Sequence, residues 1–156
     1  GTSRGRGISS SPLHLVRVDL ESGAVGLTEI CGRPDGLIAN PPLIDDRRMI
    51  AVGFDSANGV MSAFDIDPDG SLERRWSVEQ NHGSHMILDP ECGLFLSAHH
   101  DDERWMEQLI VRDIVDGSEA ARIDSGSPLQ SVVFPAPGAS RSVLACSFST
   151  VSSLSW

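Results

Sequence analysis

An internal repeat of about 46 residues constrains the fold of this chain more than any other feature. Three segments each combine a hydrophobic strand that ends in Asp with a short acidic turn that closes on Gly: LVRVDLESG, VMSAFDIDPDG and LIVRDIVDG. The aspartates are Asp19, Asp65 and Asp113, which lie 46 and 48 residues apart. A fixed period in this range is typical of repeat architectures, in which each repeat forms one supersecondary unit.

A second series of segments interleaves with the first at the same period. Each member is a strand, a polar turn and a second strand: PLIDDRRMIAVGF, MILDPECGLFLSAH and SVVFPAPGASRSVLACSF. The equivalent positions Ile44, Leu88 and Phe134 lie 44 and 46 residues apart. Each repeat therefore holds four short strands, which is the length and content of a β-propeller blade. A β-sandwich would not require turns that match in period, so we predict an all-β chain of four-stranded antiparallel blades.

The blade pattern covers residues 13–156 and amounts to about three blades. If the strands of a blade are lettered A to D from the central channel outward, the chain begins with C and D of one blade. Two full blades follow, and the chain ends with A, B and part of C of another. Residues 1–12 are expected to form a flexible N-terminal tail.

Three blades cannot close a ring, because propellers close with about four to eight blades and open sheet edges invite pairing. Two interpretations remain. The chain is a partial propeller, completed by the rest of a longer propeller, or it is half of a strand-exchanged ring formed with a second copy of itself.

The composition excludes some classes of partner. The chain carries 12 Lys and Arg against 22 Asp and Glu, a net charge of −10, which argues against nucleic acid and anionic membrane surfaces. No apolar run reaches the roughly 18–20 residues of a membrane span, and the start GTSRGRGISSSP has no apolar signal-peptide core. A periplasmic or extracellular location would therefore require a longer, exported parent chain. Cys31, Cys92 and Cys146 lack C-x-x-C spacing and are expected to be free thiols, with one disulfide as the alternative in an exported protein.

One stretch of the chain resembles a known propeller repeat. GFDSANGVMSAFDIDPDGSLERRW is similar to the repeat of quinoprotein-type, PQQ-like propellers, and DIDPDGSLE also looks like a turn of lactonase-type propellers. The positions that match the PQQ-like repeat are Gly53, Asn58, Gly59, Ala63, Asp65, Gly70 and Trp76. The resemblance implies a propeller fold but includes no catalytic signature of either family, so it says little about activity.

The stretch DIDPDGSLE also has the spacing that begins an oxygen-ligand calcium loop. The candidate ligands are Asp65, Asp67, Asp69 and Glu73. A simple turn is favoured, because the matching segments DLESG and DIVDG need Asp and Gly for backbone reasons alone. No cofactor is therefore predicted. Calcium at this loop and, through the resemblance, PQQ are the secondary candidates.

A cluster of histidines is the main candidate for a polar site. NHGSHM precedes strand A of one blade and AHHDDE follows strand B of the same blade, so the two segments should meet at one end of it. The residues are His82, His85, His99, His100, Asp101 and Asp102. Imidazoles and carboxylates could bind a ligand, hold a metal or transfer protons; ordinary exposed loop histidines are the alternative.

Arg33, Asn40 and Gln130 lie in the connections between blades and could line the channel mouth or cap turns. The favoured function is a non-enzymatic scaffold that binds a small molecule or a protein at the channel mouth. The alternative is a fragment of a propeller enzyme, of quinoprotein dehydrogenase or arylsulfotransferase type, with the histidine-rich blade edge as its site. No Ser or Cys has the base partner of a nucleophile, so the chain alone leans away from catalysis.

Overall fold

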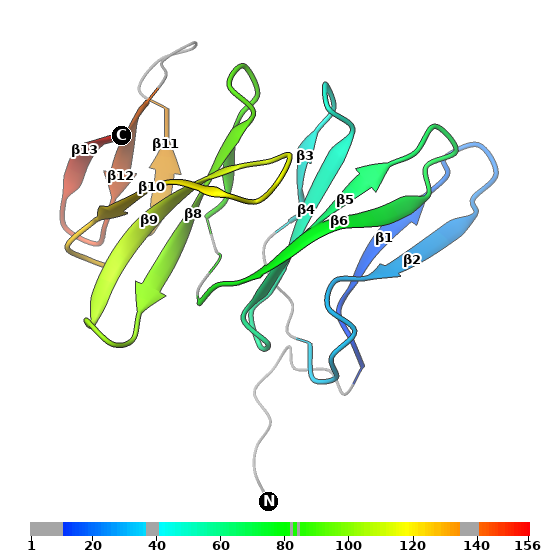
Figure 1. The fold of residues 1–156 in the computed structure, drawn as a ribbon, viewed down its shortest axis with the longest axis horizontal. Coiled ribbons are helices and arrows are strands. Elements are labelled where there is room, and N and C mark those ends of the chain that lie inside the picture. The colour runs from blue at the N-terminus through cyan, green and yellow to red at the C-terminus, as the bar shows by residue number, and fades with distance from the viewer. Residues whose placement is uncertain (1–10, 37–40, 82, 84, 135–140) are drawn as a thin grey trace, which may run out of the picture. The chain divides into compact units, whose positions relative to one another are not determined.

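The structure, a computed structural model, describes residues 11–36, 41–81, 83, 85–134 and 141–156 of the chain. Within these residues every regular element is a strand, and thirteen strands form four antiparallel sheets (Figure 1). The prediction of four-stranded antiparallel blades is confirmed, with two complete sheets and two shorter ones. The described residues contain no helix with the length and apolarity that crossing a membrane requires. The chain divides into two compact units, Gly1–Glu79 and Gln80–Trp156.

The first unit contains a two-stranded and a four-stranded sheet. The strands of the hairpin are β1 (His14–Val18) and β2 (Val25–Glu29). The four-stranded sheet has the order β3 (Leu43–Asp45), β4 (Ile50–Asp55), β5 (Val60–Ile66) and β6 (Leu72–Glu79). Each strand pairs with its neighbour in sequence, as expected for short β-branched runs joined by turns.

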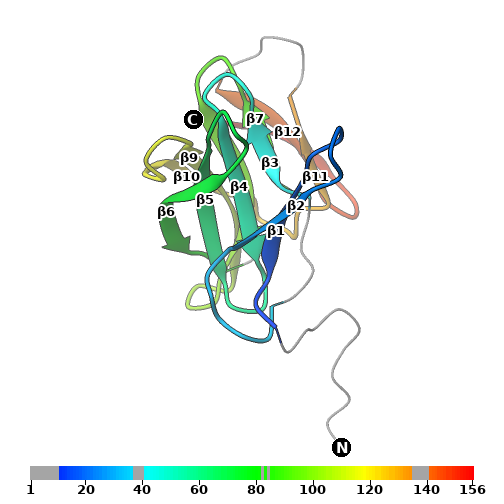
Figure 2. The ribbon, with the colours of Figure 1, turned by 90° about the vertical axis from the view of Figure 1, so that its right-hand side faces the viewer.

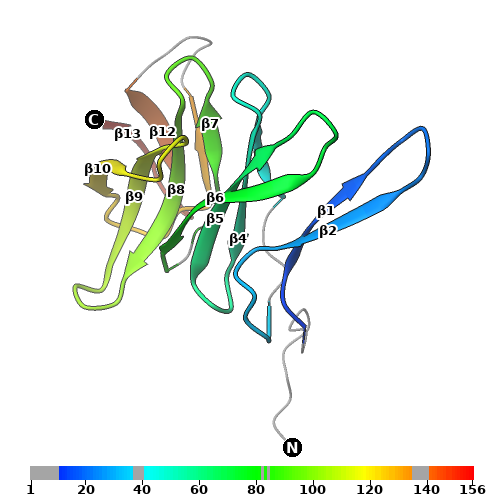
Figure 3. The ribbon, with the colours of Figure 1, turned by 45° about the vertical axis from the view of Figure 1, so that its right-hand side comes forward.

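The β1–β2 hairpin packs beside the four-stranded sheet (Figure 3). Leu15 and Ile30 form a buried cluster with Ala51 and Phe64. Gly53 permits this approach, because a Cβ atom there would lie 2.9 Å from Ile30 Cδ1. The packing of one sheet on the next is the arrangement that consecutive blades require.

The second unit repeats this plan with a four-stranded and a three-stranded sheet (Figure 1; Figure 2 gives the view turned by 90°). The four-stranded sheet contains β7 (Ile87–Asp89), β8 (Leu94–Asp101), β9 (Met106–Asp113) and β10 (Glu119–Asp124). The three-stranded sheet contains β11 (Ser131–Val133), β12 (Ser142–Cys146) and β13 (Val151–Ser155). Side chains such as Leu96, Val111 and Val143 are buried in the core between these two sheets.

Within the described part of the chain, six hairpins share one turn that an aspartate caps. The capping residues are Asp19, Asp45, Asp55, Asp89, Asp101 and Asp113, and each accepts backbone N–H groups two or three residues later. Four residues after each aspartate, the backbone enters the left-handed region, which favours glycine. The residues there are Gly23, Met49, Gly59, Gly93, Trp105 and Gly117. Met49 and Trp105 therefore occupy positions that glycine fills in the other four hairpins.

The turn between β5 and β6 departs from this series. Asp65 is not its capping residue, because the Asp65 carboxylate pairs with Arg75 at 2.7 Å. The turn starts at Asp67, whose carbonyl accepts the Gly70 N–H at 2.7 Å, and it is one residue shorter. The sequence comparison treats DIDPDG as equivalent to DLESG and DIVDG, and the structure corrects this equivalence.

Candidate functional site

At one end of the β7–β10 sheet, the segment before β7 contacts the end of β8. His99 Nδ1 lies 2.8 Å from the carbonyl oxygen of Asn81, and the Asn81 side-chain amide donates a hydrogen bond to Asp102. Since a carbonyl oxygen only accepts, His99 Nδ1 carries the proton and Nε2 of the neutral ring is an acceptor. The hydrogen bonds therefore fix how these side chains are presented at this end of the sheet.

His100, the next residue of β8, has different neighbours. Its Nδ1 atom lies 2.8 Å from Glu107 Oε1, and its Nε2 atom lies 3.5 Å from Asp102 Oδ1. The ring also meets Trp105 edge to face, with 5.8 Å between the ring centroids. Adjacent residues of a strand point to opposite faces, so His99 and His100 do not share one ligand position. Among the described residues, no three His, Cys, Asp or Glu side chains are grouped so that they could hold a metal ion.

The other predicted residues of the histidine cluster have different surroundings. Asp101 accepts the backbone N–H groups of Glu103 and Arg104, and these hydrogen bonds, chiefly the one from Arg104, lower the pKa of its carboxyl group. Asp101 is therefore used to cap the turn. His85 is half-buried in the left-handed region with φ of 55°. His82 lies outside the described residues.

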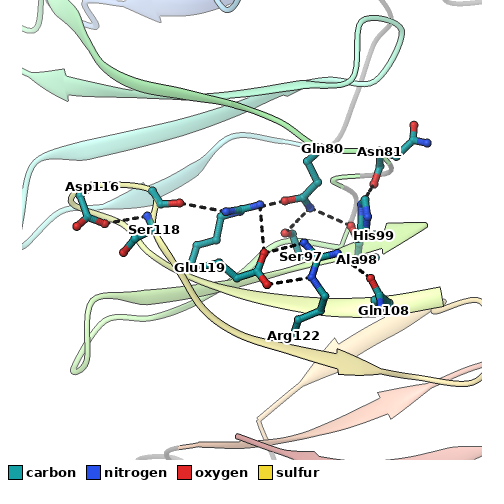
Figure 4. A network of polar contacts seen from close by, with 12 residues as sticks. Gln80, Asn81, Ser97, Ala98, His99, Gln108, Asp116, Ser118, Glu119 and Arg122 are labelled. Atoms are coloured by element: carbon teal, nitrogen blue, oxygen red, sulfur yellow. Dashed lines mark hydrogen bonds and ion pairs between the residues drawn. The ribbon is translucent and has the colours of Figure 1, made fainter. Parts of the chain in front are cut away.

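A buried polar network begins at Gln80, the residue next to Asn81 (Figure 4). Gln80 donates to Ser97 Oγ at 2.8 Å and to the Ala98 carbonyl at 3.2 Å, and its Oε1 atom accepts from Arg112 Nε at 3.1 Å. Arg112 Nη1 donates to the Gly117 carbonyl at 3.1 Å, and burial lowers the pKa of this guanidinium. The network anchors the chain before β7 to β8 and β9, and so positions Asn81.

A second group of polar contacts continues along β9 and β10. Arg122 binds both carboxylate oxygens of Glu119 at 2.9 and 2.7 Å and donates to Gln108 Oε1 at 2.8 Å. Hydrogen bonding from Arg122 is the main cause of the lowered pKa of Glu119. Gln108 then donates to Asp124, which also accepts from Arg104 at the hairpin between β8 and β9. This hairpin is thus tied to β10 through charged and amide groups.

Sequence reasoning missed Gln80, Arg112 and Trp105. The signal for Arg112 was a charged residue inside the apolar run LIVRDI, which is unusual unless the charge has buried partners. The signal for Trp105 was the alignment of DDERWM with DSANGV, which sets it against Gly59. The Trp105 side chain is 84% exposed, and its backbone has φ of 51°.

The channel-lining candidates lie in separate units. Arg33 forms an exposed ion pair with Glu79 at 3.5 Å in the first unit. Gln130 is exposed in the second unit, and its backbone N–H donates to the Cys146 carbonyl at 2.8 Å. Asn40 lies outside the described residues.

The candidate calcium ligands have individual partners. Asp67 accepts the Ser71 hydroxyl at 3.0 Å, and Asp69 Oδ1 accepts the Ser71 N–H at 2.8 Å. The pKa of Asp69 is lowered chiefly by this backbone hydrogen bond. Asp65 pairs with Arg75, as described above, and Glu73 is the exposed cross-strand partner of Asp65. These hydrogen bonds and this ion pair stabilise the turn.

All three cysteines are free thiols. Cys31 Sγ donates to Asp55 Oδ2 at 3.5 Å, and burial is the main cause of its raised pKa. A raised pKa leaves less of the reactive thiolate at neutral pH.

Comparison with known proteins identifies a similar fold. No family model matches the chain, and no curated protein matches it. A solved structure from Bacteroides uniformis, of a lactonase-type propeller proposed to be a 6-phosphogluconolactonase, is similar with a TM-score of 0.53 and 13% sequence identity. The match covers 87% of this chain and 41% of that one, so the chain spans about two fifths of its length. The likeness shows that the chain shares its fold with a lactonase-type propeller, and the PQQ-like resemblance is not confirmed.

Proposed function

We propose that this chain is part of a β-propeller that binds a ligand or a protein, and that it is not an enzyme by itself. Its binding surface is the end of the β7–β10 sheet, here named the blade end. The blade end consists of Asn81, His99, His100, Asp102 and Trp105. The supporting observation is an exposed tryptophan beside polar side chains that hydrogen bonds already hold in position. Aromatic anchors next to ordered polar groups are typical of binding surfaces.

The chemistry of the blade end favours a ligand that donates hydrogen bonds. With the proton on Nδ1, a neutral His99 ring presents its Nε2 atom as a hydrogen-bond acceptor. The Asp102 carboxylate is also an acceptor, and 70% of the Asp102 side chain is exposed. Amines, guanidinium groups and hydroxyls are suitable partners for such acceptors.

Selection from a random peptide library displayed on phage tests this function. Peptides selected on the wild-type chain are compared for binding to Asp102→Ser and His99→Ala. Asp102→Ser installs the residue that the equivalent hairpin carries as Ser56, so the turn should be retained. We expect both variants to weaken binding of the selected peptides, and the matched change Ser56→Ala to have no effect. Peptides that bind both blade-end variants as well as wild type contradict the proposal.

A second candidate function is supported by the likeness to a lactonase-type propeller. In this alternative the chain is a segment of a propeller enzyme, and His99 or His100 transfers a proton during ester hydrolysis. The test is the hydrolysis of 6-phosphogluconolactone by the full chain, measured above the spontaneous rate. An acceleration that His99→Ala or His100→Ala removes favours this function, and no acceleration argues against it.

A further inference from the structure

We infer that the partner of the blade end is a basic peptide segment of another protein, with a Lys or Arg side chain lying on the ring of Trp105. This inference rests on the proposed function and specifies the chemistry of the partner.

Trp105 and Met49 are the two residues other than glycine at this position of the six aspartate-capped hairpins, and Trp105 is the more exposed of the two. Four of the six place glycine four residues after the aspartate, and a bulky residue in this left-handed conformation is strained. The Trp105 side chain is 84% exposed, so burial of its ring does not offset that strain. A strained residue that contributes little to packing points to a role outside the fold.

The charges around Trp105 favour a cationic partner. Residues 101–107, DDERWME, contain four acidic residues and one basic residue. That basic residue, Arg104, pairs with Asp124 at 3.1 Å, while Asp102 and Glu107 face the ring of His100. The whole chain carries a net charge of −10, which adds to the attraction for cations.

A tryptophan ring is the best aromatic surface for a cation, and a basic side chain can also lay its aliphatic stem against the ring. Carboxylates beside the ring then pair with further basic residues of the same segment. A neutral sugar could also stack on the ring, but its binding would make no use of the excess negative charge. The excess negative charge therefore favours a basic peptide over a neutral sugar as the partner.

A matched pair of variants separates binding from folding. Trp105→Gly and Met49→Gly each place glycine at the fourth residue after a capping aspartate, so both should fold at least as well as wild type. Only Trp105→Gly removes the ring at the blade end. Glu103→Gln tests the contribution of an exposed charge on the same hairpin.

The probes are fluorescein-labelled hexa-arginine and hexaglutamate, and binding is measured by fluorescence anisotropy at low ionic strength. We expect hexa-arginine to bind, Trp105→Gly to weaken its binding about 5-fold, and Met49→Gly to leave it unchanged. Glu103→Gln should weaken binding about 2-fold, and added salt should weaken it for all variants.

Equal binding of hexa-arginine to wild type and Trp105→Gly would overturn the inference, as would equal losses in Trp105→Gly and Met49→Gly. Competition by unlabelled cellohexaose at equal strength would indicate a sugar site instead. If library peptides depend on Asp102 but are not basic, this inference fails while the proposed function stands. If no selected peptide depends on the blade end, both fail.

Discussion

How well a capping aspartate is hydrogen-bonded depends on the residue three positions after it. Asp45 is fully buried, and its second carboxylate oxygen accepts a hydrogen bond from Arg48 Nη1 at 2.8 Å. Asp89 occupies the equivalent position in the second unit, and Cys92 stands where Arg48 stands in the first. The Oδ2 atom of Asp89 is buried and accepts no N–H or O–H group of the described residues. Its neighbour is the Cys92 thiol, whose pKa is raised chiefly by hydrogen bonding to Asp89. A thiol is a weaker donor than a guanidinium, so the Asp89 carboxylate is less well satisfied than that of Asp45.

We therefore predict that Cys92→Arg stabilises the chain by about 1 kcal/mol, because the new guanidinium can pair with Asp89 as Arg48 pairs with Asp45. Urea unfolding of wild type and variant measures the difference. Glu91→Arg, which adds the same group one residue earlier, is the matched control and should give no comparable gain. A Cys92→Arg variant no more stable than the control contradicts the prediction.

Met49 carries the same backbone strain as Trp105 but lies outside the blade end. We predict that Met49→Gly raises the free energy of unfolding by about 0.5–1 kcal/mol, because relief of the left-handed conformation exceeds the entropy cost of glycine. The reverse change, Gly59→Ala, should lower it by about 1 kcal/mol. Thermal unfolding of both variants is the measurement, and a lower midpoint for Met49→Gly would show that Met49 is not strained.

At the scale of elements, a bulge in β10 creates the Glu119–Arg122 pair. Residues three apart in a regular strand point to opposite faces. The register between β10 and β9 shifts between Glu119 and Ala121, so Ala120 is the extra residue. The shift brings Glu119 and Arg122 to one face, where they form two hydrogen bonds.

This pair gives the chain a defined pH dependence. Arg122 lowers the pKa of Glu119 below its ordinary value of 4.5, so the folded state binds this proton less readily than the unfolded state. The stabilisation is therefore present above pH 4.5 and is lost as the pH falls through the folded pKa. We predict that Glu119→Gln is less stable than wild type at pH 7 and that the difference shrinks toward pH 3. Urea midpoints at several pH values measure it.

Glu103→Gln, a charge change outside this pair, should leave the pH profile close to that of wild type. If Glu119→Gln and wild type differ by the same amount at pH 3 and pH 7, the ion pair does not cause the pH dependence.

The strands could be predicted from the sequence, because the aspartate and glycine of each hairpin mark where a strand ends. The turn at Asp67–Gly70 could not be separated from its relatives, since it differs by one residue of length. The network around Gln80 could not be predicted from the sequence either, because Arg112 lies 32 residues from Gln80 in the chain and only the fold brings the two together. Likewise, the alignment set Trp105 against Gly59 but did not reveal the exposure or backbone angle of Trp105.

At the scale of the whole molecule, two sheets have strand positions that the described residues leave unfilled. The outward face of the β1–β2 hairpin carries four apolar side chains that are 51–64% exposed, Val16, Val18, Val25 and Leu27. The register sets Val16 opposite Leu27 and Val18 opposite Val25, so they form one patch. In the other unit, β13 pairs along its full length with β12. A second copy cannot add β1 beside β12 unless β13 is displaced.

We propose that this apolar patch is covered by a second copy of the chain or by further blades of a longer propeller. The isolated chain should then self-associate, and the double variant Val16→Lys, Leu27→Lys should reduce the association. Ser22→Lys, at the tip of the same hairpin, controls for the added charge. Sedimentation velocity over a range of concentrations measures the effect, and a monomeric wild-type chain at every concentration would contradict it.

The most direct test of the blade end as the binding surface is an NMR titration of the isotope-labelled chain with hexa-arginine. We expect the backbone amides of Asn81 and residues 99–107 to shift. The amides of the equivalent hairpin in the first unit, residues 55–60, should be unaffected. Shifts spread evenly over the acidic residues, or concentrated at residues 55–60, would show that the blade end is not the binding surface.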